Sequence, residues 1–242
     1  MIKIWQDKLA YMKKLSDWFE ILNFRNFDWK IENQEQEQKY EIVKIKNNEI
    51  KNIWLYMIPF SFGGSIAHSI IGLEMDNGNE ICVSREAQFE QWEERSFWWS
   101  INKWYRAIVL RWSAMDMLWL RDHIRWEKVI WYKLKTQEKN QKKLIQTLVE
   151  LTNNTNSKYT KYNIISQNCA SGIWKYIYNQ FELPRWSWKL LFTSFIPSIL
   201  LKKWYIYDVA YDVAYDNEIK KTKRIKKQKT WNFIKNILSY TV

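Results

Sequence analysis

The chain has 242 residues, 47% of them hydrophobic, which suits one globular domain with extensions. Its two cysteines form at most one bridge, so a disulfide-rich scaffold is excluded. A formal net charge of +12 suits a nucleic-acid-binding protein, but seven of the basic residues lie in Lys220–Lys229, and without them the charge is about +5. A nucleic acid partner is therefore not favoured.

The first 22 residues mix charged and apolar side chains and predict an amphipathic helix. We therefore assign residues 1–23 to a helical extension. Charges occur throughout this segment, which lacks the apolar core of a secretory signal, so no signal peptide is predicted. A polar stretch follows and leads into a strand expected around residues 40–45.

Residues 53–73 contain no Asp, Glu, Lys or Arg, and their length alone would permit a membrane crossing. However, Pro59, Gly63, Gly64 and His68 interrupt the segment, and an apolar run lies on either side of them. Two strands joined by a loop fit this pattern better than a membrane span.

A hairpin is predicted over residues 68–87, because its DNGN turn contains the Asn-Gly pair typical of tight β-turns. Further strands are expected at residues 105–112 and 128–134. A helix is predicted over residues 136–154, with Thr136 as its N-cap, because Leu and Ile recur there at helical spacing.

Another helix is expected to begin near residue 169, and a short one within residues 193–204. A series of strands followed by helices predicts an α+β fold, in which an antiparallel sheet packs against helices. The alternative, a parallel doubly wound sheet, needs regular alternation of strands and helices, which this chain lacks.

Cys169 is the strongest candidate for chemistry, because it lies between a polar Ser-Gln-Asn run and a predicted helix. A helix N-terminus beside a histidine lowers the pKa of a thiol. Of the two histidines, His68 begins a predicted strand, whereas His123 lies in a charged, loop-like stretch and is expected at the surface. Cys82 alternates with apolar neighbours on a strand and is expected to pack there. The alternative for Cys169 is a small buried hydrophobe.

No cofactor or metal is predicted from these residues. The cysteines and histidines lack the CxxC and HExxH spacings of zinc sites. A glycine-rich phosphate loop and a G-x-S-x-G elbow are also absent from the sequence.

Five blocks of the sequence, in order, are FRNFDW, SIAHSIIGLEMDNG, VSREAQFEQWEE, LWLRDHIRWEKVIWYKL and KYNIISQNCASGI. Together they resemble the Lnb N-terminal periplasmic domain family. The family is similar to circularly permuted, papain-like (NlpC-type) proteins such as the lecithin:retinol acyltransferase group, in which the histidine precedes the cysteine. The resemblance implies a cysteine domain, which we place at residues 24–216, followed by a basic tail at 217–242.

The resemblance implies a thiol-dependent acyltransferase or hydrolase. Cys169 would be its nucleophile and His68 its base. Glu86 would orient the imidazole, with Ser84 as the alternative for that role, and Asn168 would shape the turn or donate to an oxyanion. The chain departs from the family pattern at Gln88, at Ile124 and at Ala170–Ser171.

The resemblance further implies a lipoprotein, lipid or peptide acyl substrate and a place in the cell envelope, in the periplasm or at a membrane. The alternative function is a non-enzymatic, basic and aromatic module that binds nucleic acid or an anionic membrane surface. The stretch Lys220–Lys229 is typical of a disordered, solvated tail, and contact with an anionic membrane surface is the alternative for it.

The sequence has 17 tryptophans but only 5 glycines. Average glycine use, about 7%, would give roughly 17 glycines in a chain of this length. The resembling family has glycine at positions that correspond here to Trp92, Trp98, Trp99, Trp126 and Trp204. We therefore hypothesise that UGA codons, which some bacterial lineages read as glycine, are translated here as tryptophan. The alternative is a genuinely tryptophan-rich protein.

Overall fold

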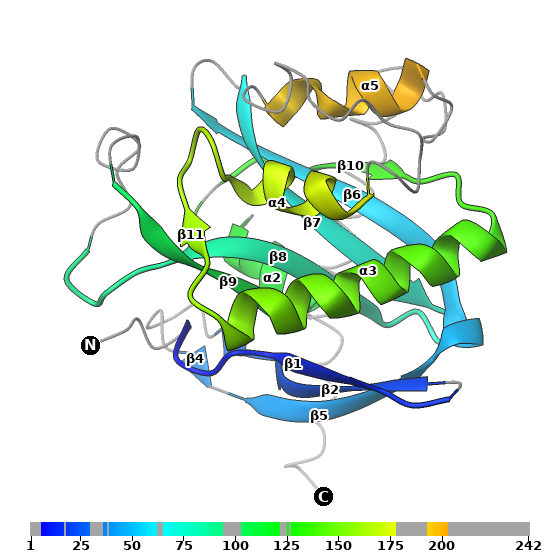
Figure 1. Ribbon diagram of the computed structural model, residues 1–242. Helices are drawn as coiled ribbons and strands as arrows, with labels where there is room; N and C mark the ends of the chain where they lie inside the picture. The colour runs from blue at the N-terminus through cyan, green and yellow to red at the C-terminus, as the bar shows by residue number, and fades with distance from the viewer. Residues whose placement is uncertain are drawn as a thin grey trace, which may run out of the picture. The chain divides into compact units, whose positions relative to one another are not determined.

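The computed structural model describes residues 6–16, 18–29, 36–37, 39–61, 65–93, 103–121, 125, 127–177 and 193–202. The chain divides into two compact units, Met1–Tyr207 and Asp208–Val242, and all described residues lie in the first. The predicted α+β class is confirmed, since this unit combines a large sheet with few described helices (Figure 1). His123 and the basic tail lie outside the described residues.

Nine strands form the main sheet. They are β1 (Tyr11–Lys14), β2 (Trp18–Arg25), β5 (Tyr40–Lys46), β6 (Ile50–Ser61), β7 (Ile66–Met75), β8 (Glu80–Gln88), β9 (Tyr105–Ser113), β10 (Ile130–Lys133) and β11 (Lys161–Tyr162). The strand order is β1-β2-β9-β8-β7-β6-β10, with β11 paired to β9 and β5 paired to β2. All pairs are antiparallel except β2–β9. Two short strands, β3 (Asp28–Trp29) and β4 (Gln36–Glu37), pair separately.

Residues 53–61 and 66–73 of the uncharged segment belong to β6 and β7, the two strands predicted there, and these pair as antiparallel neighbours. Within the described part of the chain, no helix is both long and apolar enough to span a bilayer. Residues 66–73 are buried without interruption, which explains their continuous apolar run. The predicted β7–β8 hairpin is also confirmed, and Gly78 in its turn adopts φ of 80°, a left-handed conformation that glycine accepts at little cost.

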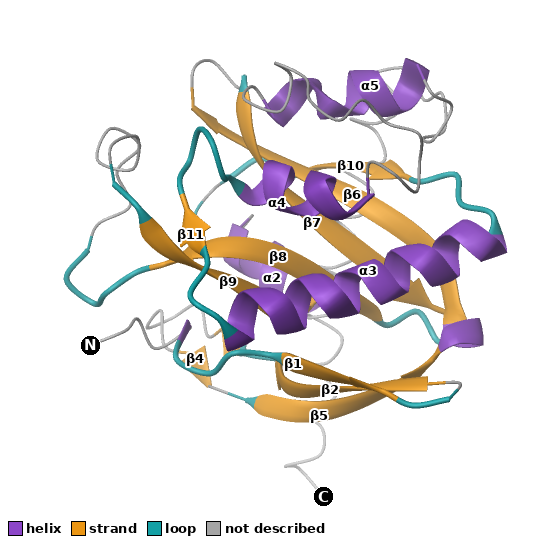
Figure 2. Ribbon diagram, in the orientation of Figure 1, coloured by secondary structure: helices purple, strands orange, loops and turns teal. Residues whose placement is uncertain are grey.

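Four α-helices and two 3₁₀ turns are described. They are η2 (Asn47–Glu49), α2 (Ala114–Trp119), α3 (Glu138–Ser157), α4 (Cys169–Ile177), η6 (Thr193–Phe195) and α5 (Ile196–Lys202). Figure 2 shows α3 and α4 across one face of the sheet, with α2 behind it. Leu148 of α3 and Ile173 of α4 share a buried core with Val83 of β8, so the sheet holds both helices against one face.

Two details at helix starts differ from the predictions. The N-cap of α3 is Gln137 rather than Thr136, and its side chain makes no capping hydrogen bond. The short helix α2 was not expected from the sequence, where it lies between two predicted strands. Ser113 caps it, because its hydroxyl accepts a hydrogen bond from the Asp116 N–H.

The predicted helical extension over residues 1–23 is wrong, since β1 and β2 occupy most of its described part. Phe19 and Ile21 are buried, whereas Trp18 and Glu20, which precede them in turn, are half-buried. This alternation is the two-residue period of a strand. This strand pairs with β5 and β9, so contacts from later in the chain decide its conformation. Asn23 lies at a register shift with φ of 55°.

The described tryptophans differ widely in exposure. Trp92 lies in a turn and is 72% exposed, as expected for a position where glycine is the natural residue. Its φ is not left-handed, however, so its backbone does not require glycine. Trp112, Trp131 and Trp174 are buried in the core. The other four positions of the glycine hypothesis lie outside the described residues.

Candidate active site

Cys169 is the first residue of α4, as the sequence predicted. Asn168 caps this helix, because its Oδ1 accepts a hydrogen bond of 2.8 Å from the Ser171 N–H. Arg85 on β8 donates to the backbone carbonyls of Gln167 (2.7 Å) and Asn168 (2.8 Å). The turn before the cysteine is therefore fixed both by the Asn168 side chain and by hydrogen bonds to its backbone carbonyls.

The Cys169 sulfur lies where the β7–β8 ladder opens. Regular pairing of the two strands ends at Ile70 and Ser84. Beyond that pair, the Ser69 N–H points to Sγ at 3.5 Å, and Sγ lies 3.9 Å from the Ala67 carbonyl oxygen. The start of α4 thus places the thiol against the edge of the strand that bears His68.

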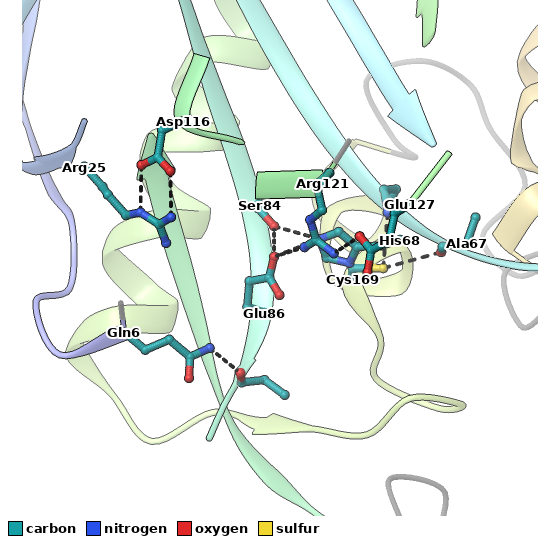
Figure 3. A network of polar contacts seen from close by, with 12 residues as sticks. Gln6, Arg25, Ala67, His68, Ser84, Glu86, Asp116, Arg121, Glu127 and Cys169 are labelled. Atoms are coloured by element: carbon teal, nitrogen blue, oxygen red, sulfur yellow. Dashed lines mark hydrogen bonds and ion pairs between the residues drawn. The ribbon is translucent and has the colours of Figure 1, made fainter. Parts of the chain in front are cut away.

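His68 links this sulfur to two polar side chains of β8 (Figure 3). Its Nε2 lies 2.8 Å from Ser84 Oγ and 3.0 Å from Glu86 Oε1. Ser84 donates its single proton to Glu86 Oε1 at 2.6 Å, so toward His68 the hydroxyl is an acceptor and Nε2 carries a proton. Nδ1 is then left for Cys169, with which the imidazole shares a hydrogen bond.

Arg121, just after α2, contacts the same carboxylate. Its Nη2 lies 3.1 Å from Glu86 Oε1, and its Nη1 donates to Glu127 Oε2 at 2.8 Å. Sequence reasoning assigned no role to this arginine, although both Arg121 and Glu127 fall in one of the blocks that resemble the family. Arg85 was missed in the same way. Their presence among the charged residues of those blocks was the signal that could have identified both arginines.

The charges of this group shift the pKa values of Cys169 and His68 in opposite directions. Burial raises the pKa of Cys169, but the charge and hydrogen bond of His68 and the Ser69 N–H outweigh it and lower the pKa to about 7. Burial lowers the pKa of His68, but the charges and hydrogen bonds of Glu86 and Cys169 outweigh it and raise the pKa to about 9. Between these values the pair is a thiolate and an imidazolium.

The site is withdrawn from solvent, since Cys169 is 3% exposed and His68 6% exposed. Poor solvation strengthens each charge interaction within the group. Cys82, on β8, is also buried and unbonded to another cysteine, as its alternating neighbours predicted. Among the described residues, no three His, Cys, Asp or Glu side chains gather in a way that would hold a metal ion.

The sheet therefore brings together four of the five residues singled out from the sequence: His68, Ser84, Glu86 and Cys169. The fifth, Asn168, lies next to the thiol, but its amide oxygen is engaged by the helix it caps, and its Nδ2 faces the Ile165 carbonyl at 3.4 Å. This arrangement has the parts that nucleophilic chemistry needs: a thiol, a neighbouring imidazole and a carboxylate that orients it.

The fold and site define an α+β domain in which a cysteine at a helix start meets a histidine on the central sheet. Residues 35–193 match the model of the Lnb N-terminal periplasmic domain, and the chain belongs to this family. Membership in a family of periplasmic domains indicates the cell envelope. Comparisons with curated proteins and with solved structures gave no match.

Proposed function

We propose that the protein is a cysteine-dependent acyltransferase or hydrolase with a circularly permuted papain-like fold. The observation that supports this most directly is the continuous chain of contacts from Cys169 through His68 to Glu86. A buried thiol used only for packing needs none of these polar neighbours, and burying them without function costs free energy. The order of histidine before cysteine along the chain agrees with a permuted papain-like fold.

Before the reaction, the thiol proton passes to His68 Nδ1, and the resulting thiolate Sγ attacks the carbonyl carbon of an ester or amide. The carbonyl electron pair moves to oxygen, and backbone N–H groups at the start of α4, that of Cys169 included, donate hydrogen bonds to this oxyanion. When the tetrahedral intermediate collapses, the bond to the leaving group breaks and the imidazolium returns its proton to that group. A thioester remains on Cys169.

In the second half, neutral His68 takes a proton from an incoming amine or water, which attacks the thioester. The carbon–sulfur bond breaks, the acyl group leaves on the acceptor and Cys169 is restored. Asn168 shapes the turn before the nucleophile in this scheme, because its amide oxygen already caps the helix. Ser84 and Glu86 hold the Nε2 proton, so that Nδ1 remains the basic nitrogen.

The proposed substrate is an acyl group of a lipoprotein, a lipid or a peptide at the cell envelope. This part rests on resemblance, since characterised members of the family move an acyl chain within a bacterial lipoprotein to its N-terminal amine. Transfer and hydrolysis differ only in whether an amine or water accepts the acyl group.

The test is labelling of the purified protein with iodoacetamide at neutral pH, together with deacylation of a lipopeptide. Cys169→Ala should abolish rapid labelling and deacylation. Cys82→Ala is the matched control, because it removes the chain's other buried cysteine, which lies on β8, and it should retain both. Full deacylation by Cys169→Ala would refute the proposal, as would rapid labelling that Cys82→Ala removes.

A further inference from the structure

Arg121 is a buried arginine that bridges two carboxylates. Its side chain is 4% exposed and contacts Glu86 at 3.1 Å and Glu127 at 2.8 Å. The backbone also links the two residues, since the Glu127 N–H donates to the Arg121 carbonyl at 2.8 Å. Neither the proposed nucleophile nor the proposed base needs this arginine to be present.

A contribution to stability does not by itself explain why an arginine and two carboxylates are buried together. Removing a guanidinium and carboxylates from water costs free energy that their attraction repays only in part, so a packed apolar cluster is often as stable as a buried ion pair. The Nε of Arg121 makes no hydrogen bond in the described structure and adds to this cost. The arginine therefore calls for an explanation that involves its charge.

The charge lies next to the groups that titrate. Glu86 from β8 acts on His68, and Arg121 from the segment between α2 and β10 acts on Glu86 and Cys169. Arg85 from β8 donates to the Asn168 carbonyl next to Cys169, and Glu127 pairs with Arg121. From β6, the residue opposite His68 is the apolar Ile58. Arg121 is thus a permanent positive charge in direct contact with Glu86.

We propose that Arg121 is a positioning residue of the Cys169–His68 site, which keeps Glu86 ionised and thereby holds a proton on His68 Nε2. This inference rests on the proposed function and deepens it. An ionised Glu86 only accepts hydrogen bonds, so Ser84 must donate to it and His68 Nε2 must carry a proton. A protonated Glu86 can donate instead, and the direction of these hydrogen bonds can reverse.

Loss of this positive charge shifts the neighbouring pKa values in a defined direction. Every nearby acid and base becomes easier to protonate, so the pH at which Cys169 ionises rises. Arg121 interacts electrostatically with Cys169, and a nearby opposite charge shifts a pKa by about 1–3 units, so Arg121→Met should move the midpoint of thiol alkylation up by about one unit. Glu127→Gln removes a negative charge and should move the same midpoint down.

The experiment measures the rate of iodoacetamide reaction at Cys169 across the pH range, in the Cys82→Ala background, for Arg121→Met, Arg121→Lys and Glu127→Gln. Arg121→Lys keeps the charge but loses the two-carboxylate fork, so its midpoint should lie closer to wild type. The matched control is Arg25→Met. Arg25 is equally buried and pairs with Asp116 at 2.7 and 2.8 Å, in a cluster apart from the site (Figure 3).

Arg25→Met should lower the free energy of unfolding without moving the midpoint. Opposite shifts for Arg121→Met and Glu127→Gln support the inference, and the Glu127→Gln shift can be read even where Arg121→Met does not fold. Unchanged midpoints in folded variants would overturn it while leaving the proposed function intact. An ordinary midpoint in the wild-type protein would instead overturn the proposed function.

Discussion

The replacement of His68 by glutamine tests the electrostatic core of the site. In the native protein the pKa of Cys169 is lowered to about 7, against an ordinary value of 9.0, and His68 is the main cause of the lowering. Glutamine keeps polar atoms in the same place but carries no charge. Burial still raises the pKa of the thiol, and the charge of His68 no longer lowers it. The pKa of Cys169 should therefore rise to 9 or above.

The expected loss of reactivity is smaller than the loss of thiolate. At pH 7 about half of the native thiol is ionised, against about 1% for a thiol of pKa 9, a difference of about fifty-fold. The thiolate of higher pKa is intrinsically more nucleophilic, by about tenfold for two units at a Brønsted slope near 0.5. The rate at pH 7 should therefore fall only about fivefold, and the midpoint of the pH profile is the sharper measure.

The assay follows iodoacetamide alkylation of Cys169 by peptide mass spectrometry from about pH 5 to pH 10, in the Cys82→Ala background. Circular dichroism confirms that His68→Gln is folded at each pH. An upward shift of the midpoint by about two units is expected. Equal midpoints for His68→Gln and the parent would show that the imidazole does not act on the sulfur, and the reasoning about this site would be refuted.

Three further predictions concern the pH dependence, the helix start and the tryptophans. Because the pKa of Cys169 is about 7 and that of His68 about 9, deacylation should follow a bell-shaped pH profile that falls below the first value and above the second, as a kcat/KM profile checks. Asn168→Ala should lower the free energy of unfolding in urea by about 1 kcal/mol, and Asn168→Asp, which can still cap α4, should restore most of it. Trp92→Gly should change that free energy by less than about 0.5 kcal/mol, whereas Trp112→Gly should cost about 3–5 kcal/mol or more. Peptide masses of the native protein should then show glycine at 92, and tryptophan at Trp92, Trp98 and Trp204 would end the recoding hypothesis.

The sequence by itself determined the elements that local interactions stabilise. The Asn-Gly turn specifies the β7–β8 hairpin, and Asn168 supplies the cap from which α4 begins at Cys169. Family resemblance and the presence of only two histidines identified His68 as the partner of that cysteine. The hairpin and the helix start depend on residues a few positions apart, which is why a linear pattern predicts them, whereas His68 and Cys169 lie far apart in the sequence and were paired through the family resemblance.

Tertiary structure alone decided the remainder. The N-terminal segment has residues that suit a helix, but pairing with β5 and β9 makes it a strand. The opening of the β7–β8 ladder that admits the thiol follows from how α4 meets the sheet. Glu86 and Arg121 are 35 positions apart, and their ion pair exists only because the fold returns the chain to the same buried place.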